Sequence, residues 1–270
     1  MSDSYAVMIQ YGMLGAITGD VIGSVLEFSE NRSPDFPLFT EDSVPTDDSL
    51  LTCAIAEACR VGSSDYKAAL VSAYRRAEAT RPQPSIGPGW GGGFANWMQG
   101  GAVGQRHSFG NGAAMRVSPI AWAFDTEDDV LRHAELSARD SHGHPEGIRG
   151  AQCTALAVWT ARRTRDPEAV LAVGRRFYDE LPDVGTLREV HRYNETCQGC
   201  VPECIVIAAS TPDFESAIRL ACSIGGDADT LGAIAGSISE ALHGGVPAPL
   251  ADEALARLER WYPWAAAAVR

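Results

Sequence analysis

Apolar residues recur at helical spacing along nearly the whole chain. The clearest run is Leu231, Ile234, Ala235, Ile238 and Leu242, which follows the i, i+3, i+4, i+7 pattern of one helix face. No segment shows sustained two-residue alternation bounded by hairpin turns. The pattern predicts an all-α fold of ten or more helices in a single domain, 1–270. Further helices are expected near residues 6–26, 50–58, 65–79, 113–124, 127–138, 146–164, 166–178, 205–209, 213–224 and 250–262.

Helix-start signals agree with this pattern. Pro167, Pro212 and Pro249 fall near predicted helix starts, where a missing N–H costs nothing. Asp166 and Asp213 are suited to cap a helix or to lie in its first turn.

Two segments interrupt the helical pattern. Residues 28–48 contain three prolines and several acids, which predicts an ordered loop. Residues 80–112 contain ten glycines, three prolines and four aromatic residues. A glycine-rich segment of this kind inside a helical domain is usually functional or disordered, and its aromatic residues favour an ordered binding loop.

The charge balance limits the classes of partner. The chain has 270 residues and a net charge of −13, with 45% apolar and 21% charged residues. Long-range attraction to nucleic acid or to an anionic membrane is therefore disfavoured. A polyanionic ligand could bind only through a local device, such as metal ions, backbone N–H groups or a few arginines.

The lack of a recognisable targeting signal and the pattern of cysteines predict a cytoplasmic protein. The first ten residues lack a basic segment followed by an apolar one, and no run of about 18 apolar residues is present. The seven cysteines are an odd number scattered among apolar helical residues, as expected of reduced structural thiols. Cys197 and Cys200 have CxxC spacing, but a zinc site would need a second well-placed pair.

One predicted helix carries a glycine stripe beside two acids. Gly15, Gly19 and Gly23 lie four residues apart on one face, and each costs roughly 1 kcal/mol relative to alanine. This stripe predicts a closely packed neighbouring helix. Asp20 and Glu27 are seven residues apart and so also share a face, and Glu27 is either a surface residue or a carboxylate that faces a cleft.

Two acidic clusters open predicted helices in distant parts of the chain. They are Thr46-Asp47-Asp48-Ser49 and the stretch Gly225-Gly226-Asp227-Ala228-Asp229-Thr230. Each can be an ordinary capped helix start with favourable first-turn acids. Together they offer four carboxylates and two or three hydroxyls, the oxygen ligands that Mg²⁺ and Mn²⁺ prefer. Both interpretations fit the spacing.

Two further motifs carry polar chemistry. Residues 108–116, Ser-Phe-Gly-Asn-Gly-Ala-Ala-Met-Arg, form a glycine-rich turn that leads into a helix, so free N–H groups could hold a phosphate. The alternative is an ordinary loop capped by Asn111. His142 and His144 are too close for a helical zinc pair, so a structural or substrate-contacting histidine is expected.

The ordered set of motifs resembles the ADP-ribosylglycohydrolase family. The motifs are GDxxGxxxE at 19–27, TDDS at 46–49, SFGNGAAMR at 108–116, SHxHP at 141–145 and GGDADT at 225–230. The resemblance covers residues 11–244. It implies an all-helical hydrolase with two Mg²⁺ or Mn²⁺ ions, which releases ADP-ribose from a modified protein or small molecule. The metal ligands that it implies are Thr46, Asp47, Asp48, Asp227, Asp229 and Thr230.

The resemblance also implies the remaining site residues. Glu27 matches a catalytic or gating carboxylate, and Asp48 and Asp229 join it as catalytic candidates; which carboxylate accepts the proton from water stays open. Glu240 stands where the family usually has a small residue, and only a distal effect is expected from it. The residues implied to bind substrate are Ser108, Phe109, Gly110, Asn111, Gly112 and His142.

Overall fold

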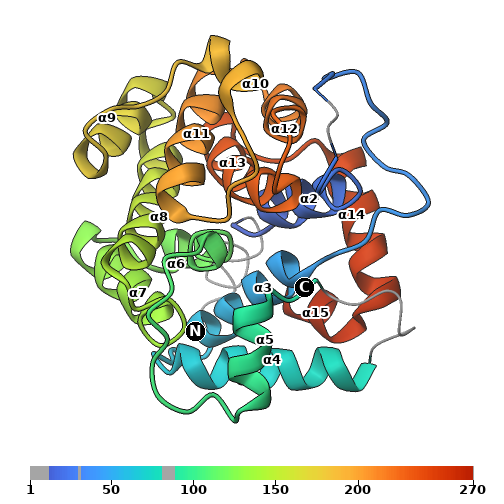
Figure 1. Ribbon diagram of the computed structural model, residues 1–270, viewed down its shortest axis with the longest axis vertical. Coiled ribbons are helices and arrows are strands. Elements are labelled where there is room, and N and C mark those ends of the chain that lie inside the picture. Colours follow the sequence, from blue (N-terminus) through green and yellow to red (C-terminus); the bar gives the residue numbers. More distant parts are fainter. Residues whose placement is uncertain (1–11, 30–31, 81–88, 270) are drawn as a thin grey trace.

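A computed structural model describes residues 12–29, 32–80 and 89–269, and these residues form a helical protein (Figure 1). Within the described ranges, the only β-pairing is an isolated bridge between Gly110 and Thr196. The prediction of an all-α fold is confirmed. The described helices are α2 (Leu14–Gly23), α3 (Asp47–Arg60), α4 (Tyr66–Thr80), α5 (Gly92–Gln99), α6 (Ser118–Ala123), α7 (Glu127–Arg139), α8 (Pro145–Thr164), α9 (Pro167–Phe177), α10 (Leu187–Val190), α11 (Cys197–Ser210), α12 (Phe214–Ser223), α13 (Ala228–His243), α14 (Ala248–Trp261) and α15 (Pro263–Val269), with 3₁₀ turns η1 (Asn111–Ala113) and η2 (Val184–Thr186).

Helix α13 is the central element. Every residue from Ala228 to Leu242 is buried, and α2, α8, α11 and α12 pack around it (Figure 1). Most residues of α13 are small or apolar on every face of the helix, and a helix of this kind is buried in the core. Its first residues, which carry the acidic motif, are therefore held inside the protein.

The glycine stripe of α2 packs directly on α13. A methyl group on Gly19 would lie 2.0 Å from the carbonyl oxygen of Gly232, and one on Gly15 would lie 2.3 Å from that of Gly236. Gly23 meets the backbone of Ala228 in the same way, at 2.3 Å. The two helices run antiparallel in backbone contact, so the predicted crowded neighbour is confirmed.

Several predicted boundaries need correction. The helix predicted over 6–26 ends at Gly23, and its first six residues lie outside the described ranges; turns follow to Phe28, which has a positive φ of 61°. The helix predicted over 113–124 is divided into η1, a turn and α6, because Pro119 lacks an N–H and lies in the first turn of α6. Helices α5, α10 and α15 were not predicted.

The predicted helix caps are confirmed. Asp166 accepts a hydrogen bond from the N–H of Glu168, and Asp213 accepts one from the N–H of Ser216. Thr46 caps α3 in the same way, through the N–H of Asp48.

Arg32 ties the loop of residues 32–46 to segments far away in the sequence. Its guanidinium donates to the carbonyls of Arg188 and His191, each at 3.2 Å, and to that of Ile224. Arginine offers five donors in a fixed plane, so one side chain can join three segments. It fixes the segment after α10 beside the Gly225-Gly226 turn.

Buried polar groups occur at the far end of the α2–α13 contact and in the core. Glu240 accepts the N–H of Gly15 at 2.8 Å, and burial raises its pKa well above the usual range. It therefore links the start of α2 to α13, far from the acidic end.

All seven cysteines are free and buried. None of the described helices has the length and hydropathy to span a membrane.

The α2–α13 contact can be tested with a single methyl group. We expect Gly19→Ala to lower the free energy of unfolding by about 1–3 kcal/mol or more. The new methyl group would meet the backbone of Gly232, which cannot move away as a flexible side chain could. Gly92→Ala is the matched control, since its new methyl would meet nothing within 4 Å. Chemical denaturation measures both, and equal stability of the two variants would contradict the contact.

Candidate functional site

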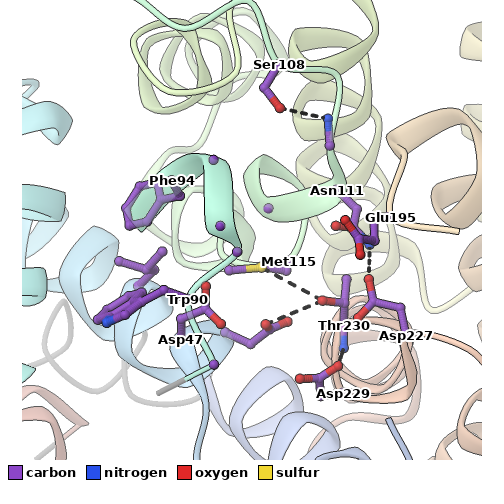
Figure 2. A pocket seen from close by; sticks show the side chains of 18 of the residues that line it. Asp47, Trp90, Phe94, Ser108, Asn111, Met115, Glu195, Asp227, Asp229 and Thr230 are labelled. Atoms are coloured by element: carbon purple, nitrogen blue, oxygen red, sulfur yellow. Dashed lines mark hydrogen bonds between the residues drawn. The ribbon is translucent and has the colours of Figure 1, made fainter. Parts of the chain in front are cut away.

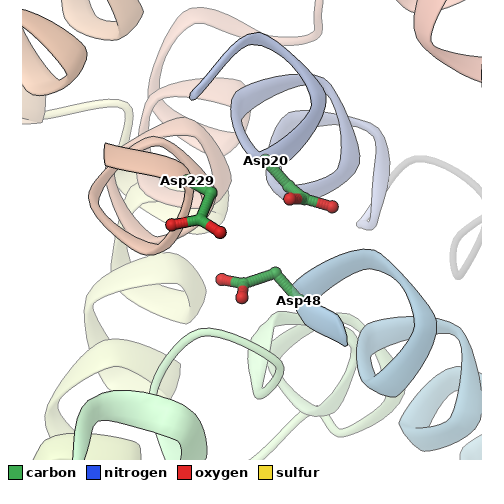
Figure 3. A group of neighbouring side chains, drawn as sticks. All are labelled: Asp20, Asp48 and Asp229. Carbon is green, nitrogen blue, oxygen red and sulfur yellow. The ribbon is translucent and has the colours of Figure 1, made fainter. Parts of the chain in front are cut away.

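Six carboxylates from three parts of the chain converge where α2, α3 and α13 meet. Oxygen atoms of Asp20, Asp48 and Asp229 lie within 4.8 Å of one another, and Figure 3 shows these three side chains facing a common point. Glu27 and Asp227 form a second such group with Asp229. The sixth acid, Asp47, is in the first turn of α3.

Asp20 anchors the start of α3. One of its carboxylate oxygens accepts from the Thr46 hydroxyl at 2.7 Å, and the other accepts the N–H groups of Thr46 and Ser49 and the Ser49 hydroxyl. Sequence reasoning placed Asp20 only on a face with Glu27 and missed this role. The sequence indicated this role only through the position of Asp20 directly after Gly19, within the glycine stripe that predicts a close helix contact.

The acidic turn before α13 leaves its carboxylates free of a capping role. Asp227 occupies the N-cap position but makes no side-chain capping bond. It accepts instead from the amide of Asn111 at 2.6 Å (Figure 2). Gly225 and Gly226 adopt φ of 82° and 84°, which favours glycine. The interpretation of this turn as an ordinary capped helix start is therefore wrong for Asp227, and so is that of Asn111 as a loop cap.

The Thr230 hydroxyl completes the cluster. It lies 3.4 Å from Asp48 Oδ2, while Asp48 Oδ1 is buried and lacks a hydrogen-bond partner among the described residues. Buried acceptors are normally satisfied, so an unpaired carboxylate oxygen in this position suits a ligand that supplies positive charge.

Burial raises the pKa of every acid in the cluster, and repulsion by neighbouring acids raises it further for all of them except Asp229. The pKa of Asp20 rises to about 7 through burial and the charge of Asp229. That of Glu27 rises to about 8 through burial, Asp229 and Asp20. The pKa values of Asp47, Asp48, Asp227 and Asp229 are also raised, in each case mainly by burial.

The donor set fits hard divalent cations. All candidate ligand atoms are carboxylate or hydroxyl oxygens, and close carboxylates with raised pKa values gain most when a cation neutralises them. Asp47, Asp48, Asp227, Asp229, Glu27 and Thr230 could provide ligands, whereas Asp20 and Thr46 are already bonded to one another.

A cavity of about 340 Å³ opens from the carboxylate cluster, and its two ends differ in charge. The acidic end is lined by Glu27, Asp47, Asp48, Asp227 and Asp229. The donor end is lined by residues 91–93, Arg106, Ser108, Gly110 and Gly112. Asn111 also lines the cavity and joins the two groups, because its amide donates to Asp227. A ligand with separate anionic and reactive parts would be oriented by this difference.

The start of α5 supplies donors that sequence reasoning did not assign. The Gly91 carbonyl accepts the N–H groups of Phe94 and Ala95, while the first N–H groups of a helix have no acceptor within it. Methyl groups on Gly91 or Gly92 would meet nothing within 4 Å, so this backbone is open to a ligand. Arg106 packs against Gly93. Three consecutive glycines, Gly91 to Gly93, mark this helix start in the sequence.

The Ser108–Gly112 segment lies along the cavity but uses some of its donors internally. The Gly110 N–H donates to the Ser108 hydroxyl at 3.1 Å, and the Asn111 N–H donates to the carbonyl of Glu195 at 2.7 Å. The expectation of free N–H groups is therefore wrong at these two positions. The bond to Glu195 joins this segment to the one before α11.

The structure brings most of the predicted substrate-binding residues to the cavity, with one exception. Ser108, Gly110, Asn111, Gly112 and His142 line it. Phe109 is not among the lining residues. It is 46% exposed and packs edge-on against His144, which caps α8, with ring centroids 5.4 Å apart.

An aromatic pair stands beside the acidic end. The rings of Phe28 and Tyr193 are stacked with centroids 5.2 Å apart, and both residues line the cavity. The Tyr193 hydroxyl donates to Glu195 at 2.5 Å. Phe28 is held by its N–H, which donates to the carbonyl of Gly226. Neither aromatic residue was predicted as part of the site.

The raised pKa values predict pH-dependent stabilisation by Mg²⁺. A carboxylate with a raised folded-state pKa keeps its proton in the fold, so ionisation destabilises the metal-free protein as pH rises from about 4 to about 8. Because protons and cations compete, we expect the Mg²⁺-induced rise in Tm to be small at about pH 5 and larger at about pH 8.

Calorimetry of two variants provides the control for this effect. Asp229→Asn should reduce the Mg²⁺-induced rise, whereas the exposed Glu135→Gln should not change it. A rise that is independent of pH, or the same in both variants, would count against the cluster as the binding site.

Comparisons with known proteins agree with the geometry. An uncharacterised protein of Archaeoglobus fulgidus is 29% identical over 153 residues, half of each chain. Human ADP-ribosylhydrolase ARH3 is 25% identical over 184 residues, 51% of each chain. ADP-ribosylarginine hydrolase Tri1 of Pseudomonas putida is 26% identical over 266 residues, 86% of this chain and 69% of that protein. The first two alignments thus span about half the length of those relatives.

The fold and the family agree along almost the full chain. A solved structure described as an ADP-ribosylglycohydrolase-related protein complex matches with a TM-score of 0.66 and 25% identity, and covers 99% of this chain and 98% of that one. The family model for ADP-ribosylglycohydrolase matches residues 1–268. The chain belongs to the ADP-ribosylglycohydrolase family.

Proposed function

We propose that this protein is a hydrolase that requires divalent cations and cleaves the glycosidic bond between ADP-ribose and an acceptor group. One observation carries the proposal: five of the six clustered carboxylates line a cavity that is also lined by Arg106 and by backbone N–H donors. The diphosphate would lie at the donor end, and the anomeric carbon of the terminal ribose would face the acids. This arrangement also explains how a chain with a net charge of −13 binds a polyanion.

Two divalent cations, Mg²⁺ or Mn²⁺, would be held by Thr230 and by the carboxylates of Asp47, Asp48, Asp227 and Asp229. When bound, they would neutralise these acids and orient the ribose hydroxyls and a water molecule. Thr46, implied as a ligand by the family resemblance, is better placed to fix Asp20 and the first turn of α3.

The protein's own groups account for the proton and charge movements. Water adds across the glycosidic bond, with its hydroxyl joining the anomeric carbon and its proton ending on the acceptor. Glu27 lines the cavity beside Asp227 and Asp229, which places its carboxylate to exchange a proton with the water or the acceptor. The carboxylates of Asp48 and Asp229 would stabilise the oxocarbenium-like transition state.

The acceptor would leave past Phe28 and Tyr193, which line the cavity and are both exposed to solvent. Arginine, serine and small molecules are all candidate acceptors. A panel of defined ADP-ribosylated substrates would identify the acceptor, and it would also distinguish hydrolysis from two alternatives. A non-catalytic relative would bind ADP-ribose without turnover, and a hydrolase of another nucleoside-type bond would not release free ADP-ribose.

The carboxylate cluster is tested by conservative amide substitutions. We expect Asp47→Asn and Asp229→Asn to lower release of ADP-ribose by about 10²-fold or more, because each removes a charge at the reacting centre. Excess EDTA should stop turnover, and Mg²⁺ or Mn²⁺ should restore it. Mass analysis of the products measures the loss, and full turnover in EDTA would refute the proposal.

The donor end is tested through Arg106. We expect Arg106→Ala to weaken ADP-ribose binding roughly tenfold, because the side chain lines the cavity next to the start of α5. Arg75→Ala, which removes an exposed arginine of α4, is the matched control. Calorimetric titration with ADP-ribose measures both, and unchanged affinity of Arg106→Ala would place the diphosphate elsewhere.

A further inference from the structure

His142 presents one ring nitrogen to the cavity. It lies in the turn between α7 and α8 and is 6% exposed. A methyl group on Gly112 would lie 3.0 Å from its Nε2, and one on Gly110 would lie 3.7 Å away. No hydrogen bond to this nitrogen is found within the described ranges. Nε2 is therefore available at the donor end of the cavity.

The other ring nitrogen belongs to a buried hydrogen-bonded chain. His142 Nδ1 lies 2.9 Å from the Ser141 hydroxyl, and Arg116 Nη2 donates to the same hydroxyl at 2.6 Å. Arginine has donors only, so Ser141 must accept from Arg116. Its own hydrogen is then available for one acceptor.

Two acceptors compete for the Ser141 hydrogen, and geometry separates them. The carbonyl oxygen of Ala138 is 3.4 Å away and already accepts the N–H groups of His142 at 2.7 Å and Ser141 at 3.1 Å. Both of its lone pairs are thus used, and the distance is long for an O–H···O bond. The hydrogen therefore goes to His142 Nδ1, which leaves the ring proton on Nε2.

The surroundings keep the ring neutral. Burial, together with the nearby guanidinium groups of Arg116 and Arg106, lowers the pKa of His142 well below its ordinary value. A neutral ring carries one proton, on one nitrogen or the other. The partner of Nδ1 decides which nitrogen carries it.

We propose that Arg116 and Ser141 are positioning residues that hold His142 as the neutral tautomer protonated at Nε2, so that the ring offers a fixed donor to the anionic part of the ligand. Arg116 is fully buried and acts through Ser141. The identity of the ligand rests on the proposed function, whereas the tautomer does not. The donor end would thus gain an uncharged hydrogen bond that does not change around neutral pH.

Nitrogen-15 NMR of histidine-labelled, Mg²⁺-loaded protein tests the tautomer directly. The chain has six histidines, and His142→Gln identifies the signals of His142. We expect a proton on Nε2 and no titration between about pH 5 and 8. Ser141→Ala should allow the Nδ1-protonated form to appear. A wild-type ring that is protonated on Nδ1, or a tautomer unchanged in Ser141→Ala, would overturn the proposal.

Binding of ADP-ribose tests the consequence. His142→Gln places an amide nitrogen near the position of Nε2, so it should keep affinity within about threefold, whereas His142→Asn and Ser141→Ala should weaken binding roughly tenfold. Equal losses in His142→Gln and His142→Asn would remove the donor role. If wild-type protein binds no ADP-ribose, the proposed function fails, while the NMR result still decides the tautomer.

Discussion

The site depends on the backbone contact between α2 and α13. Gly19 and Gly232 each approach the other's carbonyl so closely that a methyl group on either would lie 2.0–2.4 Å from it. Because the helices are antiparallel, the end of α2 meets the start of α13, which brings Glu27 to Asp227 and Asp229. From the same helix, Asp20 reaches across to α3 and fixes the turn that carries Asp47 and Asp48.

This packing holds the protein together around a group of like charges. Six acids share one small volume and all have raised pKa values, so the metal-free fold contains repulsion that only protons or cations can relieve. The backbone contact between α2 and α13, together with the bond of Glu240 to the start of α2, opposes that repulsion. The same pair of helices, α2 and α13, thus supplies both the close packing and several of the acids that repel one another.

Local sequence signals predicted the helices, caps and acidic motifs because these depend on neighbouring residues. Asp20, the start of α5 and the pair of Phe28 and Tyr193 could not be assigned in this way, since their roles come from contacts between distant segments. Phe109 shows the reverse case: its motif suggested a ligand contact, but the ring packs against His144 outside the cavity lining. The tautomer of His142 likewise depends on Arg116 and Ser141, which only the fold brings together.

The central claim is that the three converging segments form one site that binds two divalent cations and, next to them, ADP-ribose. Anomalous diffraction from crystals grown with Mn²⁺ and ADP-ribose tests it most directly. The account predicts two Mn²⁺ peaks among Glu27, Asp47, Asp48, Asp227, Asp229 and Thr230, with the terminal ribose beside them and the diphosphate near Arg106. Mn²⁺ found only at surface acids, or ADP-ribose bound away from this cluster, would contradict it.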